Sequence, residues 1–297
     1  MLARLQKFTT LGLLAVALAW AVFAWRAGNT AWALGGAALI VFAYAFVLAV
    51  EFVLLRIAHG NDPTPRASSA QLFGAWWGEV RSAPRVFCWQ QPFRSRRWPD
   101  HLPADARGRR GIVLVHGFVC NRGLWNPWLK RLHARNLPCI AVNLEPVFGS
   151  IDQYADTIEA AVACVEHATG MPPLIVAHSM GGIAVRRWAA EAANYQRVHH
   201  MITIATPHTG TWLAQFAMTP NGHQMHRDSP WLHSLAAREP AGVSERFTCY
   251  YGHCDNIVFP PATAALAGAD NRHLAGVAHV HMATRPEPWE EAMRWLM

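Results

Sequence analysis

The chain has 297 residues, enough for one large domain or two small ones, and its formal net charge is +7. Hydrophobic residues make up 52% of it and charged residues only 15%, which is apolar for a soluble protein, and the excess lies mostly near the N-terminus. No nucleic-acid recognition motif accompanies the positive charge, so the sequence does not predict a nucleic-acid partner.

Two apolar stretches near the N-terminus predict transmembrane helices. Residues Phe8–Trp25 carry no charge over 18 positions, and Ala31–Leu55 carry only Glu51 over 25. A helix needs about 20 apolar residues to cross a bilayer, and a helix in a globular protein is seldom apolar all round. The sequence therefore predicts a membrane anchor over residues 1–60, made of two spans.

The charges that flank these spans predict their orientation. Arg4 and Lys7 precede the first span, Arg56 and Arg66 follow the second, and one arginine lies between the spans. Positive charge on both outer flanks favours a hairpin in the bacterial inner membrane, with everything after residue 56 on the cytoplasmic side. The alternative is a signal peptide over Met1–Ala33, followed by one anchor and an external domain.

Residues 61–110 form a predicted connector, which six prolines interrupt and to which Val86–Trp89 could add a strand. Its arginines are interleaved with tryptophans, which suits contact with anionic lipid headgroups, and a plain solvated surface is the alternative interpretation. The six cysteines of the chain show no C-x-x-C pair, so we expect reduced thiols, with Cys249 and Cys254 as the one conceivable disulfide.

From residue 111 onward, short apolar runs alternate with helical patterns. The predicted strands cover residues 112–115, 138–143, 174–177, 200–205, 246–251 and 272–277. Such alternation predicts an α/β domain over residues 111–297, with a mostly parallel central sheet flanked by helices. Active sites in such sheets lie past the carboxyl ends of the strands.

The segment Leu174–Gly182 predicts a strand, a sharp turn and a helix, with a serine at the turn. It reads Leu-Ile-Val-Ala-His-Ser-Met-Gly-Gly. Small residues at Ala177 and Gly181 let the strand and the helix pass close together, and the turn lifts the hydroxyl of Ser179 clear of the sheet. We therefore expect Ser179 to be a nucleophile at a strand–turn–helix elbow.

A serine nucleophile needs a histidine to take its proton and a carboxylate to orient that histidine. After an elbow serine the acid should come first in the chain and the base second. Asp255 follows a predicted strand directly, and His279 follows the last one, so they are the predicted acid and base. The competing carboxylates and imidazoles are Asp228, Asp270, His273 and His281.

The oxyanion of a tetrahedral intermediate needs two backbone N–H donors. One is expected from Met180, the residue after the nucleophile, and the other from Phe118, in the loop after the first strand of this region. Gly117 allows the backbone to approach closely, and we expect His116 to be a structural hydrogen-bonding residue.

Together these motifs resemble the α/β-hydrolases of the bacterial lipase/esterase type over about residues 111–297. The motifs that carry the resemblance are His116-Gly117-Phe118, Ala177-His178-Ser179-Met180-Gly181-Gly182, Thr206-Pro207-His208-Thr209-Gly210, Asp255 and His279. The resemblance implies an α/β-hydrolase fold, a triad of Ser179, Asp255 and His279, and oxyanion donors at Phe118 and Met180. The further candidates for substrate binding are His116, His178, His208 and Trp212. The two N-terminal spans are not part of the common lipase pattern.

Residues 211–245 are apolar but interrupted by proline and glycine, which predicts either a small cap over the site or an ordinary helical insertion. No phosphate-binding loop, G-x-G-x-x-G motif or zinc spacing is present, so the sequence predicts no cofactor and no metal.

The sequence as a whole predicts a membrane-anchored serine hydrolase that cleaves carboxylic esters of acylglycerols or other lipids through an acyl-enzyme. An acyltransferase or a thioesterase that uses the same triad is one alternative, and a catalytically silent membrane-bound scaffold is another. The sequence gives no indication of the oligomeric state.

Overall fold

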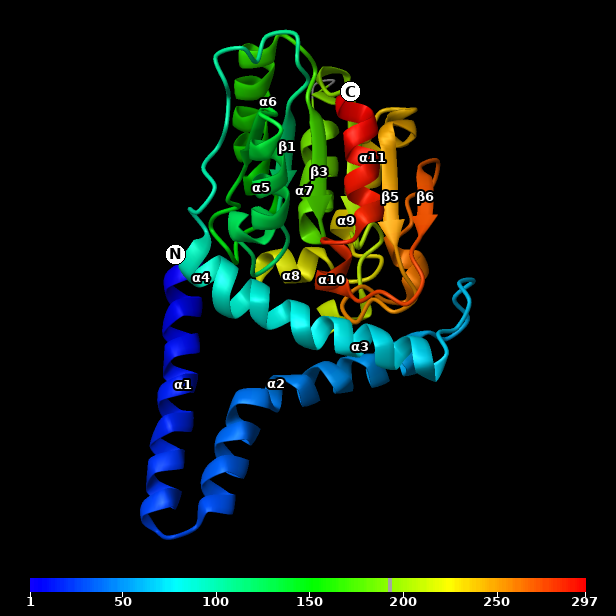
Figure 1. Ribbon diagram of the computed structural model, residues 1–297. Coiled ribbons are helices and arrows are strands. Elements are labelled where there is room, and N and C mark those ends of the chain that lie inside the picture. Colours follow the sequence, from blue (N-terminus) through cyan, green and yellow to red (C-terminus); the bar gives the residue numbers. More distant parts are fainter. Residues whose placement is uncertain (192–193) are drawn as a thin grey trace.

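The computed structural model describes residues 1–191 and 194–297, and it places a parallel sheet at one end of a long helical hairpin (Figure 1). The six strands are hydrogen-bonded in the order β2-β1-β3-β4-β5-β6, and every neighbouring pair is parallel. They are β1 (Ile112–Val115), β2 (Cys139–Ala141), β3 (Leu174–His178), β4 (His200–Ile204), β5 (Phe247–Tyr251) and β6 (Asp270–His273). The predicted α/β fold with a parallel central sheet is therefore confirmed.

Helices precede the sheet and flank it. The α-helices are α1 (Leu2–Arg26), α2 (Thr30–Ala58), α3 (Ser69–Pro84), α4 (Gln91–Arg94), α5 (Asn126–Ala134), α6 (Ala155–Thr169), α7 (Met180–Ala189), α8 (Pro220–Gln224), α9 (Pro230–Arg238), α10 (His279–Met282) and α11 (Pro286–Leu296). A π-helical segment, η1 (Arg85–Gln90), joins α3 to α4, and the 3-10 turns are η2 (Arg122–Trp125), η3 (Ile151–Tyr154), η4 (Asn194–Arg197), η5 (Trp212–Phe216), η6 (Val243–Arg246) and η7 (Pro261–Ala264).

Side-chain alternation along the strands fills two cores, one on each face of the sheet. Val113 and Val115 of β1 point to the face covered by α6 and α7, while Ile112 and Leu114 point to the face covered by α5 and α11. Strands that are buried on both faces read as continuous apolar runs, which is how the sequence pattern identified them. The carboxyl ends of all the strands therefore meet at one edge of the sheet, which faces α3 and the hairpin (Figure 1).

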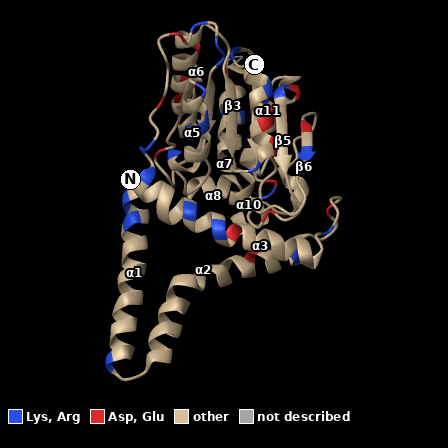
Figure 2. Ribbon diagram, in the orientation of Figure 1, with Lys and Arg blue, Asp and Glu red and all other residues tan. Residues whose placement is uncertain are grey.

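The hairpin consists of α1 and α2, and most of its apolar surface is exposed. Its two helices meet at a short turn, where the side chain of Asn29 accepts a hydrogen bond from the Trp32 N–H at 3.0 Å and caps α2. Only 11% of the most apolar window of α1 and 17% of that of α2 is buried. At 1.5 Å per residue, the 25 residues of α1 span about 37 Å. Both helices are long and apolar enough to cross a membrane, and Figure 2 shows almost no charge between their ends.

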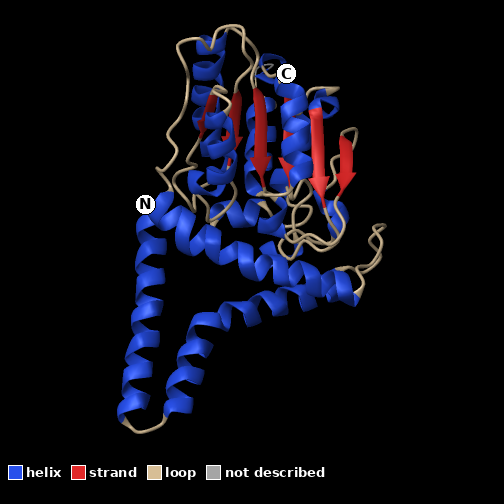
Figure 3. Cartoon of the chain, viewed as in Figure 1, coloured by secondary structure: helices blue, strands red, loops and turns tan. Residues whose placement is uncertain are grey.

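The second half of α2 turns away from α1 and lies beside α3, which crosses the edge of the sheet (Figure 1). The Tyr44 hydroxyl donates to the Val80 carbonyl at 2.9 Å, and Trp76 Nε1 donates to the Ala45 carbonyl at 2.9 Å. The predicted connector is thus largely helical and packed (Figure 3), and it carries α3 to the strand ends where the candidate site lies.

Two sequence expectations differ from the structure. Val86–Trp89, proposed as a strand, lies in η1, because the segment continues the helical path of α3 and has no sheet edge beside it with which to pair. The last strand was expected at residues 272–277 but is β6, Asp270–His273. Its pairing with β5 ends at His273, and the chain then turns through Gly276, which has a φ of +70°.

Candidate active site

Ser179 lies at the turn between β3 and α7, in a strained backbone conformation with φ 56° and ψ −133°. A non-glycine residue in such a conformation costs on the order of 1–3 kcal/mol and needs support from its surroundings. That support comes from the next strand and the loop after it. The Ser179 N–H donates to the Ile204 carbonyl, and the Thr206 hydroxyl donates to the Ser179 carbonyl, both at 2.9 Å. The Thr-Pro-His motif therefore stabilises the elbow through its threonine.

Two glycines let the backbone close around Ser179. A Cβ on Gly181 would lie 2.5 Å from the His116 carbonyl oxygen, and one on Gly117 would lie 2.6 Å from the Cβ of Ser179. Both distances are too short for any real side chain. The loop after β1 thus comes directly against the serine, which is the approach an oxyanion donor from that loop requires.

Asp255 and His279 are hydrogen-bonded to each other. His279 Nδ1 lies 3.0 Å from both carboxylate oxygens of Asp255 and donates its proton to them. The Ile257 and Val258 N–H groups donate to Oδ1 of Asp255 at 2.9 and 2.8 Å, which fixes the carboxylate. Because Nδ1 carries the proton, Nε2 of the imidazole keeps its lone pair and is free to act as a base.

The surroundings of His279 favour its protonated form. Burial by itself lowers the pKa of the imidazole, but the charges of Asp255 and Glu79 outweigh burial, and the net effect is a pKa raised above the usual histidine value. An imidazole of raised pKa takes up the proton of a serine hydroxyl more readily, and Asp255 stabilises the imidazolium that forms.

A residue of the N-terminal hairpin holds the backbone of His279 through one intermediary, Asn256. The His279 N–H donates to Oδ1 of Asn256 at 3.2 Å, and Nδ2 of Asn256 donates to Glu51 of α2 at 2.6 Å. Glu51 is the sole charge in its apolar span, and no role was predicted for it. An ionisable residue inside an apolar span is by default a candidate functional residue, and this signal could have identified it.

A second carboxylate, Glu79 of α3, holds the residues that follow His279. Its two oxygens accept the N–H groups of Val280 and His281, at 3.0 Å each. Glu79 is 1% exposed, and burial raises its pKa to about 7 although the two N–H groups favour the charged form. Sequence reasoning missed Glu79, because nothing in the local pattern of α3 connects it with a loop some 200 positions later.

The two expected oxyanion donors belong to the residue after Ser179 and to the loop after β1 that approaches it. Met180 is the first residue of α7, where the N-terminal N–H groups and the helix dipole favour negative charge. Over residues 1–191 and 194–297, neither the Phe118 N–H nor the Met180 N–H has a protein hydrogen-bond acceptor. Phe118 and Ser179 line the same pocket, so the assignment of both donors remains a prediction that this arrangement supports.

Ser179 and His279 open into a pocket of about 720 Å³. The end that holds the candidate triad is formed by the segments at and after the carboxyl ends of β1, β3, β5 and β6, and the rest of the wall comes from the N-terminal helices. The residues that these helices contribute are Thr10, Leu13, Leu14, Val41, Phe42, Tyr44, Val47, Leu48, Glu51, Glu79, Ala83, Pro84, Phe87 and Cys88. Residues 211–245, for which either a small cap or an ordinary helical insertion was expected, contribute none of the described lining residues. They form η5, α8, α9 and η6, and the N-terminal helices supply most of the pocket wall.

Two of the histidines proposed for substrate binding, His116 and His178, form hydrogen bonds to the backbone of the site. His116 donates from Nδ1 to the Gly117 carbonyl at 2.9 Å and accepts the Leu144 N–H at Nε2, so it fixes the loop before Phe118. His178 lines the pocket, and its Nε2 donates to the His279 carbonyl at 3.1 Å. Burial lowers the pKa of His116 to about 4 and that of His178 to about 3, so both rings are neutral.

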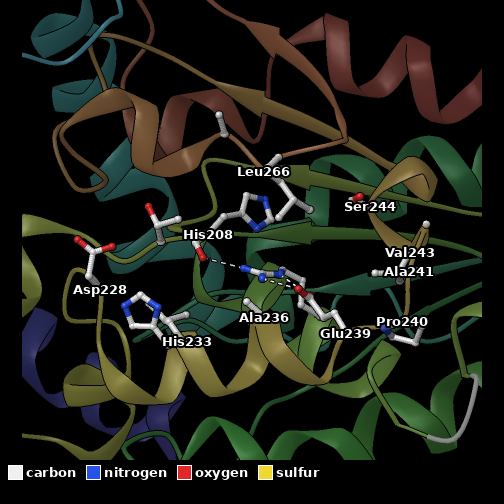
Figure 4. Close-up of a pocket in the computed structure, with 16 residues that line it drawn as sticks. His208, Asp228, His233, Ala236, Glu239, Pro240, Ala241, Val243, Ser244 and Leu266 are labelled. Atoms are coloured by element: carbon white, nitrogen blue, oxygen red, sulfur yellow. Dashed lines mark hydrogen bonds and ion pairs between the residues drawn. The ribbon is translucent and has the colours of Figure 1, made fainter.

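The other two proposed binding residues lie outside this pocket. His208 lines a separate cavity of about 380 Å³, shown in Figure 4, which none of the triad candidates lines. There Arg186 is already neutralised, because it donates to both oxygens of Glu239 and to the His208 carbonyl at 2.7–2.8 Å. Trp212 stacks on Phe259 in an apolar cluster that includes side chains of α2.

The two competing carboxylates lie outside the pocket that Ser179 and His279 line. Asp270 forms an ion pair with Arg272, and Asp228 lines the separate cavity of Figure 4. Among the described residues, no group of three or more His, Cys, Asp or Glu side chains is arranged to hold a metal ion.

Comparison with known proteins identifies the family. The model of the alpha/beta hydrolase family matches residues 112–297, and the chain belongs to that family. Its structure is similar to mature lipase BlEst2 from Bacillus licheniformis, with a TM-score of 0.57 and 16% identity over 66% of this chain and 96% of that one.

A second similar structure is lipase B from Aspergillus fumigatus, with a TM-score of 0.55 and 19% identity. The match covers 66% of this chain and 55% of the fungal protein, so this chain spans about half the length of that lipase. At these identities the likeness shows the shared fold. Comparison with curated proteins gives no match.

Proposed function

We propose that this chain is a membrane-anchored serine hydrolase that cleaves carboxylic esters of lipids through an acyl-enzyme. The observation that carries the proposal is the His279–Asp255 hydrogen bond beside an elbow serine, in a pocket whose remaining wall is mainly apolar. The similarity of the fold to two lipases supports the same class of reaction.

In the proposed reaction Ser179 Oγ attacks the ester carbonyl carbon while Nε2 of His279 takes its proton. The carbonyl oxygen becomes an oxyanion that accepts hydrogen bonds from the Phe118 and Met180 N–H groups. The alcohol then leaves with the proton from His279, and the acyl group stays on Ser179. A water molecule, deprotonated by His279, attacks this acyl-enzyme, and the carboxylic acid departs as the proton returns to the serine.

The anchor is proposed because of the exposed apolar surface of α1 and α2. Soluble monomers rarely expose a continuous apolar patch of more than a few hundred Å², whereas both helices leave most of their apolar side chains uncovered. A bilayer would cover this surface. The charges at the two outer flanks favour a hairpin with the catalytic domain on the cytoplasmic side.

The test is labelling by a fluorophosphonate together with hydrolysis of p-nitrophenyl esters, on the full chain in detergent. We expect the wild-type chain to be labelled and active, and Ser179→Ala to lose labelling and at least about 10³-fold of kcat, because no other nucleophile replaces the hydroxyl. The matched control is Ser234→Ala, which removes an exposed serine of α9 and should change neither readout. A wild-type chain that neither labels nor hydrolyses any ester would refute the proposal and favour a silent scaffold.

A further inference from the structure

We propose that the two N-terminal helices form the acyl-chain site of this enzyme and that a lipid ester reaches Ser179 directly from the bilayer, between α1 and α2. The inference rests on the proposed function, and it identifies where the acyl chain of the substrate binds. In this interpretation the hairpin is part of the active site as well as an anchor.

The pocket combines the polar groups of the candidate active site with a mainly apolar wall. Ser179, His279 and Asn256 line it from the α/β domain. Leu14 of α1 and Val47 of α2 belong to the apolar wall. A volume of about 720 Å³ is within the range of roughly 300–1,000 Å³ that ligand pockets occupy. An ester whose carbonyl lies at the serine would thus direct its acyl chain along the two helices.

The polar groups that the N-terminal helices contribute to this wall are already paired within the protein. The Thr10 hydroxyl donates to the Gln6 carbonyl at 2.7 Å, and the Tyr44 hydroxyl donates to the Val80 carbonyl at 2.9 Å. Glu51 accepts from Asn256, and Glu79 accepts from two backbone N–H groups. These groups therefore have no need of a polar ligand, and the wall offers a ligand mainly apolar contact.

The surface around the pocket is apolar as well. Leu11 of α1 is 48% exposed and Val53 of α2 is 58% exposed, and neither lines the pocket. The helices that form the pocket wall are thus the same helices whose outer faces a bilayer would cover. An acyl chain that moved from the bilayer into the pocket would exchange one apolar environment for another and would not need to enter water.

The helices also hold the catalytic base, which explains why the hairpin cannot be a loosely tethered anchor. Glu51 of α2 holds Asn256, which in turn holds the His279 N–H. Gln6 of α1 donates to the Val119 carbonyl at 3.3 Å, next to the expected oxyanion donor Phe118. The same contacts that align the chemical groups therefore fix the acyl-chain wall relative to them.

The experiment compares p-nitrophenyl palmitate with p-nitrophenyl butyrate, using the full chain in phosphatidylcholine vesicles. Leu14→Trp and Val47→Trp place a large side chain in the pocket wall. Leu11→Trp and Val53→Trp are matched controls, because they make the same substitutions on the same helices at residues of nearly equal exposure (48% against 50%, and 58% against 57%). We expect each pocket variant to lower the palmitate-to-butyrate ratio of kcat/KM at least tenfold, and the two controls to leave that ratio unchanged.

The two proposals fail in different ways. If the wild-type chain hydrolyses neither ester and is not labelled by a fluorophosphonate, the proposed function is wrong. The wild type could be active while Leu14→Trp and Val47→Trp leave the palmitate-to-butyrate ratio unchanged, or lower kcat/KM for the two esters by the same factor. In either case the acyl-chain site is not between these helices. Butyrate hydrolysis and fluorophosphonate labelling of each variant report whether its catalytic domain is folded.

Discussion

Ser179 carries a backbone strain that its neighbours compensate, and the residues that do so come from separate parts of the chain. The hydroxyl of Thr206 holds its carbonyl, Gly117 and Gly181 make room for it, and Asp255 orients the histidine beside it. Each of these residues has one role that its chemical type explains.

At the residue scale, the raised pKa of His279 sets a pH dependence. The base must be neutral to accept the proton of Ser179, so kcat/KM should rise with pH and reach half its plateau above about pH 6.5, the usual histidine value.

Glu79→Gln removes one of the charges that raise the pKa of His279, so the midpoint of this profile should move to lower pH. The kcat should also fall about tenfold, at a nearly unchanged KM. The reason is the loss of a charge-assisted hydrogen bond of about 1.5 kcal/mol between residue 79 and the backbone N–H groups that follow His279.

The pH profile of kcat/KM for p-nitrophenyl butyrate measures both effects. Glu290→Gln is the control, since it removes the same charge from an exposed position on α11 and should alter neither the midpoint nor kcat. An unchanged midpoint together with an unchanged kcat in Glu79→Gln would show that Glu79 has no part in positioning the base.

At the element scale, the important contact is between α3 and the single turn of α10, where His279 lies. Glu79 binds the backbone N–H groups of that turn, and Gly78 provides the space for the contact, because a Cβ there would lie 2.7 Å from Nδ1 of His281. An element as short as α10 has little stability of its own, so its position depends on what packs against it.

Gly78→Val should therefore displace α3 from α10 and lower kcat/KM by up to about 10²-fold, the effect of moving a catalytic group by about 1 Å. Gly74→Val is the matched control on the same helix, since a Cβ at Gly74 meets nothing within 4 Å. Both variants carry the same cost in helix propensity, so a lower kcat/KM in Gly78→Val than in Gly74→Val reports the loss of the α3–α10 contact. Equal activities of the two variants would contradict the role of the α3–α10 contact.

The sequence predicted local features of the site more readily than it predicted the contacts between distant segments. The elbow at Ser179 follows from a strand–turn–helix pattern within nine residues, and Asp255 and His279 follow from their places after strands. The hydrogen bond between Asp255 and His279 then lies where the order of the motifs suggested. The sheet was predicted because buried parallel strands leave a clear apolar pattern.

The residues that hold the loop around His279 were not predicted, for a physical reason. Glu79 and Val280 are 201 positions apart, and no local periodicity encodes such a contact. In a helix that is apolar all round, the residues that face a pocket cannot be distinguished from those that face lipid, so the wall at Leu14 and Val47 left no pattern to find. Glu51 was the exception, since its charge in an apolar span is visible in the sequence.

At the scale of the whole molecule, the hairpin brings both of its outer ends to the catalytic domain. The N-terminus lies beside α4, and α2 ends beside α3, while the turn between the helices points away from the sheet (Figure 1). If α1 and α2 cross the bilayer, this turn emerges on the side opposite the catalytic domain.

Ala27→Cys places a thiol at that turn, where Ala27 is exposed, and Cys88→Ser removes one of the two exposed native thiols, which leaves Cys164 on α6 of the catalytic domain. In sealed right-side-out bacterial vesicles, a membrane-impermeant maleimide should label the thiol introduced at Ala27 and reach Cys164 only after the membrane is permeabilised. The chain without the Ala27 substitution, tested in intact and in permeabilised vesicles, is the control for Cys164. Labelling of Cys164 in intact vesicles would place the catalytic domain outside and favour a different topology.

Glu51 accepts a hydrogen bond from Asn256, and Glu79 accepts two from the backbone of Val280 and His281, so the N-terminal helices and the loop that holds His279 are thermodynamically coupled. The docked helices stabilise the ordered conformation of the loop that carries His279. The ordered loop stabilises the docking of the helices by the same free energy, because coupling between two sites is equal in both directions. A ligand that binds only the docked arrangement would further stabilise that arrangement by its binding free energy. An inhibitor selected for tight binding at Ser179 would therefore also hold the hairpin to the domain, and a detergent that separated the hairpin would weaken the inhibitor by the same factor.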